Sequence, residues 1–167
     1  TALPTMSLRA RLLQTLEAAF PLVDAPATRE DISAWELNKA TGSYQPFIDE
    51  VGGIEGKAVL DFGCGHGGET LWLAQNGAEA IGVDIDAHSL AECYRLAEAH
   101  PFADPDRLQF REATTSSVPV DDNSIDLILS TNVFEHVMDI PGILAELHRV
   151  LKPGGSLMTR FGPLFYS

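Results

Sequence analysis

Cysteine is scarce in this chain, with only Cys64 and Cys93 among 167 residues. Two cysteines at this spacing form neither a disulfide framework nor a zinc motif, so we expect a reduced, cytoplasmic protein with no metal site. The sequence also lacks an apolar run of the roughly 20 residues that a membrane helix needs. It has no basic-then-apolar leader, and we therefore expect neither secretion nor a membrane partner.

Positive charge is also in short supply. The chain has 11 Lys and Arg residues against 24 Asp and Glu residues, which gives a formal net charge of −13. A nucleic-acid site needs a basic stripe, and here the basic residues are scattered singly, so we exclude DNA and RNA as partners. The acidity otherwise indicates a well-solvated surface. The length is enough for one domain with a substantial core.

The segment Val59–Gly68 is the most informative part of the sequence. An apolar run there ends in Asp61, a run of glycines follows, and the residues after it predict the start of a helix. A second apolar run ends in Asp84. Glycine suits such a turn because its backbone can adopt positive φ and lie against a ligand. An acid at the tip of the second strand can accept hydrogen bonds from a ribose diol, so the pattern predicts an adenosine-containing cofactor.

Two classes of cofactor fit the glycine turn. Gly63–Gly68 satisfies the dinucleotide pattern G-x-G-x-x-G, which alone is a weak signal. Asp61, two residues earlier, would repel a pyrophosphate at close range and would suit a cofactor with a cationic end. This favours S-adenosylmethionine over NAD. An NAD-dependent oxidoreductase and a non-catalytic cofactor-binding module remain as alternatives.

Five segments in order resemble the class I S-adenosylmethionine-dependent methyltransferases of the methyltransferase type 11 sort, which act on small molecules. The resemblance runs from about Tyr44 to Phe161, and its segments are Val59–Gly67, Gly82–Ile85, Asp122–Ile128, Phe134–Val137 and Leu151–Gly155. It implies methyl transfer from S-adenosylmethionine to a small-molecule acceptor. It also implies a Rossmann-like, doubly wound parallel sheet.

The pattern of apolar runs and turn residues agrees with that α/β fold. We expect strands at Ala58–Phe62, Ala80–Val83, Leu108–Arg111, Ile125–Ser130 and Ser156–Arg160, helices at Gly68–Asn76, Ala87–His100 and Pro141–Leu151, and a turn over Lys152–Gly155. Strands that alternate with helices predict a parallel sheet with right-handed crossovers.

The domain organisation predicted from the sequence has two parts. Residues 1–52 carry three helical patterns, at 7–20, 28–40 and 44–51, and form an N-terminal helical cap over the cofactor or over a sheet edge. Residues 53–167 form the S-adenosylmethionine-binding core. The family adds a helix and an antiparallel hairpin after the fifth strand, so we expect a domain truncated there. The edge thus exposed predicts a homodimer.

The candidate cofactor residues follow the strands. Carboxyl ends of parallel strands share one edge of a sheet, and polar groups stand at or just after four of them. The resemblance implies that Gly63 and Gly65 approach the methionine part and that Asp61 supports its ammonium. It implies that Asp84 binds the ribose, Ile85 lies on the adenine and Asn132 lies near the sulfonium. Glu112 and Ala113 match the family's Asp-Ala pair, whose acid accepts from the adenine amino group. Tyr44 begins the segment that leads into the first strand, so we expect it to close over the methionine end. Asp61 could instead only brace the glycine turn, and Glu112 could be a surface carboxylate.

His136 is the one catalytic candidate. It follows the fourth strand on the acceptor side, where a histidine could take a proton from a hydroxyl acceptor. The alternative, which we favour from the sequence, is that Glu135 and His136 orient the junction between strand and helix. Ubiquinone-biosynthesis O-methyltransferases hold a divalent metal there with Glu-x-x-Glu-His, but Asn132 occupies the first position here, so we expect no metal.

Overall fold

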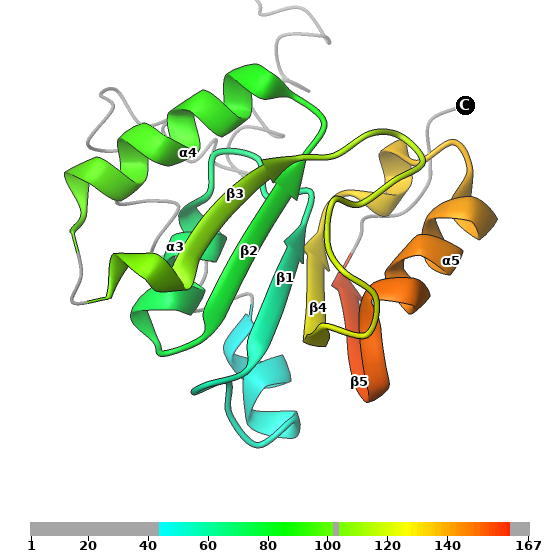
Figure 1. Ribbon diagram of the computed structural model, residues 1–167, viewed down its shortest axis with the longest axis horizontal. Coiled ribbons are helices and arrows are strands. Elements are labelled where there is room, and N and C mark those ends of the chain that lie inside the picture. The colour runs from blue at the N-terminus through cyan, green and yellow to red at the C-terminus, as the bar shows by residue number, and fades with distance from the viewer. Residues whose placement is uncertain (1–43, 102–103, 161–167) are drawn as a thin grey trace, which may run out of the picture. The chain divides into compact units, whose positions relative to one another are not determined.

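The computed structural model describes residues 44–101 and 104–160, all within one compact unit of the chain. Five parallel strands form one sheet in the order β3-β2-β1-β4-β5 (Figure 1). The strands are β1 (Ala58–Phe62), β2 (Glu79–Asp84), β3 (Leu108–Glu112), β4 (Ile125–Thr131) and β5 (Leu151–Arg160). This sheet confirms the predicted Rossmann-like α/β fold.

Helices cover both faces of the sheet. They are α3 (Gly68–Gln75), α4 (Ala87–Ala99) and α5 (Ile140–Val150), with short 3-10 turns at Pro105–Arg107 and Phe134–His136. Successive residues of a strand point to opposite faces. Accordingly, Val59 shares a buried cluster with Leu73 of α3, whereas Leu60 shares one with Leu147 of α5. Among the described residues, no helix has the length and apolar character that crossing a membrane requires.

Residues 44–50 form a helical segment that packs into the core of this unit. Tyr44 and Ile48 are 1% and 6% exposed, and they belong to the cluster that contains Val59 and Leu73. The sequence assigns this segment to an N-terminal cap, and the predicted helices at 7–20 and 28–40 lie outside the described residues. The division of the chain at residue 52 stays a prediction.

The expected turn over Lys152–Gly155 lies inside β5 instead of before it. Ile125 of β4 pairs with Leu151 and Leu127 pairs with Ser156, so β5 advances five positions while β4 advances two. Such an irregularity is a bulge. Proline and glycine in this stretch suggest a break in the strand, but the strand pairs on both sides of it, and this explains the difference.

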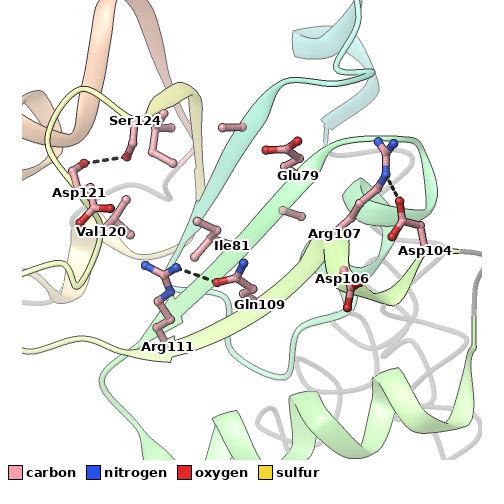
Figure 2. A pocket seen from close by; sticks show the side chains of 13 residues that line it. Glu79, Ile81, Asp104, Asp106, Arg107, Gln109, Arg111, Val120, Asp121 and Ser124 are labelled. Atoms are coloured by element: carbon pink, nitrogen blue, oxygen red, sulfur yellow. Dashed lines mark hydrogen bonds and ion pairs between the residues drawn. The ribbon is translucent and has the colours of Figure 1, made fainter.

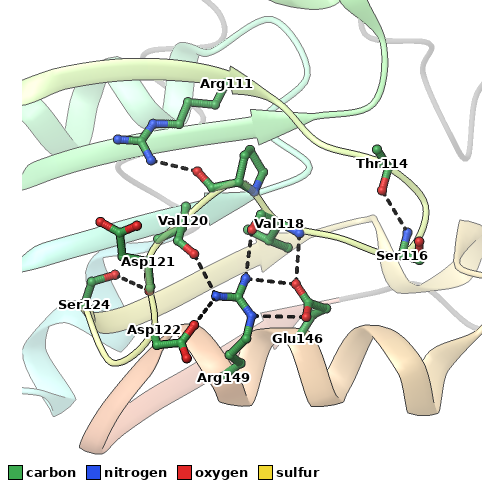
Figure 3. Close-up of polar contacts among 11 residues, drawn as sticks. Arg111, Thr114, Ser116, Val118, Val120, Asp121, Asp122, Ser124, Glu146 and Arg149 are labelled. Atoms are coloured by element: carbon green, nitrogen blue, oxygen red, sulfur yellow. Dashed lines mark hydrogen bonds and ion pairs between the residues drawn. The ribbon is translucent and has the colours of Figure 1, made fainter.

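Residues 113–124, which join β3 to β4, form a loop that is tied to α5 by Arg149 (Figure 3). The guanidinium donates to the backbone oxygens of Val118 and Val120, each at 2.9 Å, and to a carboxylate oxygen of Asp122 at 2.6 Å. It also donates to both oxygens of Glu146, whose carboxylate accepts the Val118 N–H at 3.2 Å. These hydrogen bonds lower the pKa of Glu146, and together they fix the path of the loop.

Arg149→Met is expected to lower the free energy of unfolding by roughly 1–3 kcal/mol, because two backbone carbonyls lose a charged donor. Denaturant unfolding measures the loss. The matched control is Arg95→Met on α4, which removes an exposed ion pair with Glu92 and should cost about 0.5 kcal/mol or less. The folded protein lowers the pKa of Glu146, so the ionised Glu146 carboxylate adds to the free energy of unfolding above about pH 4.5. This part of the stability is lost as the pH falls and the carboxylate is protonated. Equal losses in the two variants would contradict the anchoring role.

Candidate functional site

A cavity of about 380 Å³ opens at the carboxyl ends of the strands. Seven of the ten predicted site residues line it: Gly63, Gly65, Asp84, Ile85, Ala113, Asn132 and His136. Tyr44, Asp61 and Glu112 do not. Residues from the tips of four strands, β1 to β4, therefore meet at one cavity, which is the arrangement expected of a ligand site in an open parallel sheet.

The glycine turn after β1 forms one wall of the cavity. Gly63, Gly65 and Gly67 all have positive φ, of 77°, 53° and 81°. A Cβ on Gly63 would strike the side chain of Val133, and one on Gly67 would lie 2.9 Å from both Cys93 and Phe110. A Cβ on Gly65 would meet no protein atom within 4 Å. Gly65 is thus the position where the bare backbone faces open space that a ligand can fill.

Asp84, at the end of β2, is held in place by the backbone. One carboxylate oxygen accepts the Gly65 N–H at 2.9 Å, and the other accepts the Asp86 N–H at 2.9 Å. A carboxylate offers about four acceptor positions, so each oxygen retains capacity for a ligand hydroxyl. The carboxylate is oriented before any ligand arrives, and it is coupled directly to the glycine turn.

Asp61 lies beneath the turn rather than on the cavity wall. It is 1% exposed, and its two oxygens accept from the Tyr44 hydroxyl at 3.0 Å and the Thr70 hydroxyl at 2.6 Å. The Tyr44 hydroxyl also lies 3.3 Å from a carboxylate oxygen of Glu69. Burial, followed by the charges of Asp61 and Glu69, raises the pKa of Tyr44, so the hydroxyl keeps its proton and acts as a donor.

Tyr44→Phe is expected to lower the free energy of unfolding by about 1–3 kcal/mol, because a buried carboxylate loses one of its donors. Tyr94→Phe is the matched control, since that hydroxyl also donates one hydrogen bond, to the Phe110 carbonyl at 2.9 Å, but its side chain is 54% exposed. Solvent can replace that bond, and the control should lose less than about 1 kcal/mol. Chemical denaturation compares the two, and a larger loss in the control would refute the bracing of Asp61.

The predicted adenine-side residues are placed unequally. Ile85 lines the cavity and is 61% exposed, which is high for a large apolar side chain. Ala113 is buried in the cavity wall, where its N–H donates to the Asp84 carbonyl at 2.8 Å. Glu112 is the last residue of β3 and is exposed outside the cavity. The Glu112 carboxylate therefore shows no contact with the cavity.

Asn132 and His136 form another part of the cavity wall. Asn132 has a φ of 58°, and its N–H donates to the Arg160 carbonyl at 2.7 Å, so the chain turns sharply as it leaves β4. Asparagine tolerates this left-handed conformation better than most residues. His136 is exposed and ends the short 3-10 turn, with its N–H bonded to the Val133 carbonyl at 2.8 Å.

Sequence reasoning missed half of the cavity wall. The additional lining residues are Phe62, Val83, Thr114, Thr115, Val133, Val137 and Ile143. Thr114 and Thr115 follow Ala113 directly, so their place after a strand tip was a usable signal. The apolar residues gave none, because a valine or isoleucine beside a ligand has the same sequence pattern as one in the core.

A second cavity, of about 410 Å³, lies at the opposite end of the strands (Figure 2). Both arginines of this cavity already donate to protein groups. Arg107 donates to Asp104 at 2.6 Å, and Arg111 donates to Gln109 and to the Pro119 carbonyl, both at 2.7 Å. It contains none of the predicted site residues, and the carboxyl-end cavity is therefore the functional candidate.

Comparison with known families agrees with this geometry. A family described as methyltransferase domain matches residues 60–159, which include the glycine turn, Asp84 and the wall formed by Asn132 and His136. The chain belongs to the methyltransferase domain family. The predicted class I S-adenosylmethionine-dependent family is thereby confirmed.

Relatives of this methyltransferase domain differ in their acceptors. This chain is 32% identical over 112 residues to a ubiquinone biosynthesis O-methyltransferase of Pseudomonas aeruginosa, and the match covers 66% of the chain and 47% of the relative. It is 31% identical over 121 residues to a sterol 24-C-methyltransferase of Pneumocystis carinii, covering 71% and 32%. The chain thus spans less than half the length of these relatives.

Solved structures share the fold of the methyltransferase domain. An S-adenosylmethionine-dependent methyltransferase from Mesorhizobium loti superimposes with a TM-score of 0.57 and 24% identity, covering 70% of this chain and 52% of that one. One from Aquifex aeolicus gives a TM-score of 0.62 and 20% identity, covering 76% and 71%.

The residues of the cavity fit S-adenosylmethionine. The open space beside Gly65 accommodates a ligand that lies against the backbone, and the spare acceptor positions of Asp84 suit two ribose hydroxyls. Ile85 supplies an exposed apolar surface for a flat base. The Asp61 carboxyl lies behind the cavity wall, and an acid there suits a cationic ligand better than a pyrophosphate.

Proposed function

We propose that this domain binds S-adenosylmethionine in the carboxyl-end cavity and supports transfer of its methyl group to a small-molecule acceptor. The observation that carries the proposal is Asp84, oriented by two backbone N–H groups beside the Cβ-free Gly65. The Asp61 charge and the match of residues 60–159 to the methyltransferase domain family favour this cofactor over NAD.

The proposed mechanism depends mainly on positioning. When bound, S-adenosylmethionine supplies a methyl group activated by a sulfonium. Asp84 would accept hydrogen bonds from the ribose, and Gly63 and Gly65 would let the backbone approach the methionine end. Val133 and Val137 line the cavity with apolar surface that excludes water. Holding an acceptor in line with the methyl group provides much of the rate increase in such a reaction.

The acceptor is proposed by class only. Curated relatives include O- and C-methyltransferases and, at 28% identity over 113 residues, a phosphoethanolamine N-methyltransferase of Arabidopsis thaliana. The net charge of −13 disfavours a polyanion such as nucleic acid. A small, neutral or cationic acceptor fits this charge best.

Location and assembly are likewise proposals. Cys64 and Cys93 are both free and buried, which supports a reducing compartment such as the cytoplasm. β5 has one partner, β4, among the described strands, and an unpaired strand edge supports a homodimer. Sedimentation of the full chain at two concentrations tests the dimer, which predicts a concentration-dependent mass.

His136→Ala is expected to leave cofactor affinity unchanged and, if His136 is the general base, to reduce turnover about a hundredfold. Its exposed side chain on the cavity wall supports a role at the site over a packing role. Calorimetry measures the cofactor affinity and thermal unfolding measures the melting temperature. Turnover is measured once an acceptor has been identified. A lowered melting temperature with normal turnover would assign the residue to the strand-helix junction instead.

Calorimetry tests the central proposal. S-adenosylhomocysteine should bind to the full chain with one-to-one stoichiometry, and NADH should not bind. NADH binding without S-adenosylhomocysteine binding would support the oxidoreductase. Binding of S-adenosylhomocysteine with no methylation of any screened acceptor would support a non-catalytic binding module.

A further inference from the structure

The two cysteines of the chain, 29 positions apart, converge on one atom of the glycine turn. Cys93 of α4 donates its S–H to the Gly65 carbonyl oxygen at 3.1 Å, and the Cys64 sulfur lies 4.0 Å from the same oxygen. Both cysteines also belong to one small buried cluster. The two sulfurs are therefore neighbours in the fold, although nothing in the sequence spacing indicates it.

This thiol pair is coupled to the proposed cofactor cavity through a single residue. The Gly65 carbonyl accepts from Cys93, while the Gly65 N–H donates to Asp84. Gly65 and Asp84 both line the cavity. A change in the position of either sulfur therefore acts on Gly65. This residue orients Asp84, the proposed ribose-binding carboxylate, and faces the proposed ligand.

We propose that Cys64 and Cys93 form an oxidative modification site, in which a reversible disulfide between them weakens binding in the cofactor cavity. The proposal rests on the proposed function, because the ligand that is lost is the cofactor. A disulfide requires the sulfurs to be about 2.05 Å apart, which is shorter than a hydrogen bond between thiols. It also removes both S–H donors, so the Gly65 carbonyl loses its bond from Cys93.

The glycine turn is the part that would move. Cys93 is 0% exposed on a regular helix and packs with Leu90 and Phe110. Cys64 is 7% exposed in a turn whose neighbours have positive φ. Closing the disulfide would therefore draw the turn toward α4, which displaces Gly65 from Asp84 and changes the wall that faces the cofactor.

The oxidant we propose is hydrogen peroxide, which is small enough to reach a nearly buried thiol. The Cys64 thiol loses its proton to solvent, and the thiolate attacks one peroxide oxygen and becomes a sulfenic acid. The O–O bond breaks, and the leaving hydroxide takes up that proton and departs as the first water. The Cys93 sulfur then attacks the sulfenic sulfur, the disulfide forms, and the sulfenic oxygen leaves as the second water. Two thiols lose two electrons and two protons, and one peroxide is reduced to two waters.

Oxidation should be slow and should accelerate with pH. The hydrogen bond with Cys93, then burial, and then the charge of Asp61 raise the pKa of Cys64. The thiol form therefore dominates at neutral pH, and only the thiolate reacts. The pair should stay reduced under ordinary conditions and respond to sustained peroxide.

The experiment uses the full chain and S-adenosylhomocysteine. Reduced protein is treated with peroxide, a portion is denatured and alkylated with N-ethylmaleimide for intact mass, and calorimetry is run on the rest. Since the chain has only two cysteines, a monomer that has lost both alkylation sites and two hydrogens contains this disulfide. We expect affinity to fall about tenfold or more, as when a hydrogen bond to a charged group is lost, and dithiothreitol should restore it.

Cys64→Ser removes the sulfur that peroxide oxidises first and so prevents the disulfide, and the variant is compared with itself before and after peroxide. We expect its affinity to be unaffected by peroxide. The inference would be overturned if this variant lost affinity, or if the disulfide left the wild-type affinity unchanged. It would also be overturned if the wild-type thiols stayed free or linked two chains. Reduced wild-type protein that fails to bind S-adenosylhomocysteine would instead remove the proposed function, and this inference with it.

Discussion

Asp84→Ala is expected to weaken binding of S-adenosylhomocysteine about a hundredfold or more while the chain stays folded. The carboxylate would make two charge-assisted hydrogen bonds to the ribose, each worth roughly 1.5–3 kcal/mol. The variant also leaves the N–H groups of Gly65 and Asp86 without the Asp84 carboxylate to which they donate in the wild-type protein. Calorimetry measures the affinity, and circular dichroism with thermal unfolding verifies the fold.

Asp86→Ala is the matched control for this change. Asp86 is an exposed acid two residues away, and it caps α4 by accepting the N–H groups of His88 and Ser89, both at 3.2 Å. Its loss should lower the melting temperature modestly and leave the affinity unchanged. Unchanged affinity in Asp84→Ala would remove the ribose assignment. Equal losses in both variants would point to general damage of the turn.

Gly65→Val is expected to abolish cofactor binding while the protein still folds. A Cβ at this position meets no protein atom within 4 Å, so the added side chain would occupy ligand space and would not strike the core. The cost to the fold comes from the positive φ of 53°, where a β-branched residue loses of order 1–3 kcal/mol. Calorimetry with S-adenosylhomocysteine and denaturant unfolding give the two quantities.

Substitutions at two other glycines separate the effect of filling the ligand space from the effects of positive φ and of a clash with the protein. Gly56→Val introduces the same side chain at a φ of 69°, also with no atom within 4 Å, but in the turn before β1. It should lose similar stability and keep its affinity. Gly63→Val should unfold the protein or destabilise it most, because its side chain would strike Val133. If Gly65→Val binds normally, the open space beside it is not the cofactor site.

The helices and strands of the described unit were largely predictable from the sequence. β1 was expected at Ala58–Phe62 and lies there, and the other strand and helix ends differ by at most one residue, except at the start of β5. Buried strands flanked by glycine turns give a strong signal, because apolar runs of this length between turn residues suit few other structures. In β5, Pro153 and Gly154 suggested a break, whereas backbone pairing continued around them.

Contacts between distant residues were the part that the sequence could not supply. The strand tips could be grouped because parallel strands share a direction, and Asp84 and Asn132 line one cavity for that reason. The hydrogen bond from Tyr44 to Asp61 and the meeting of Cys64 with Cys93 depend on how helices pack on the sheet. No periodicity encodes that packing, so these contacts became visible only in three dimensions.

The attachment of the 113–124 loop bears on how such a domain can diversify. Arg149 holds the loop mainly through the carbonyl oxygens of Val118 and Val120, and every residue type has a carbonyl. Exposed side chains such as those of Thr115, which lines the cavity, and Ser116 beside it can therefore be exchanged without releasing the anchor. A loop that is held through its main chain can change in sequence and keep its path. Selection can therefore alter the rim of the cavity while the glycine turn and Asp84 stay unchanged.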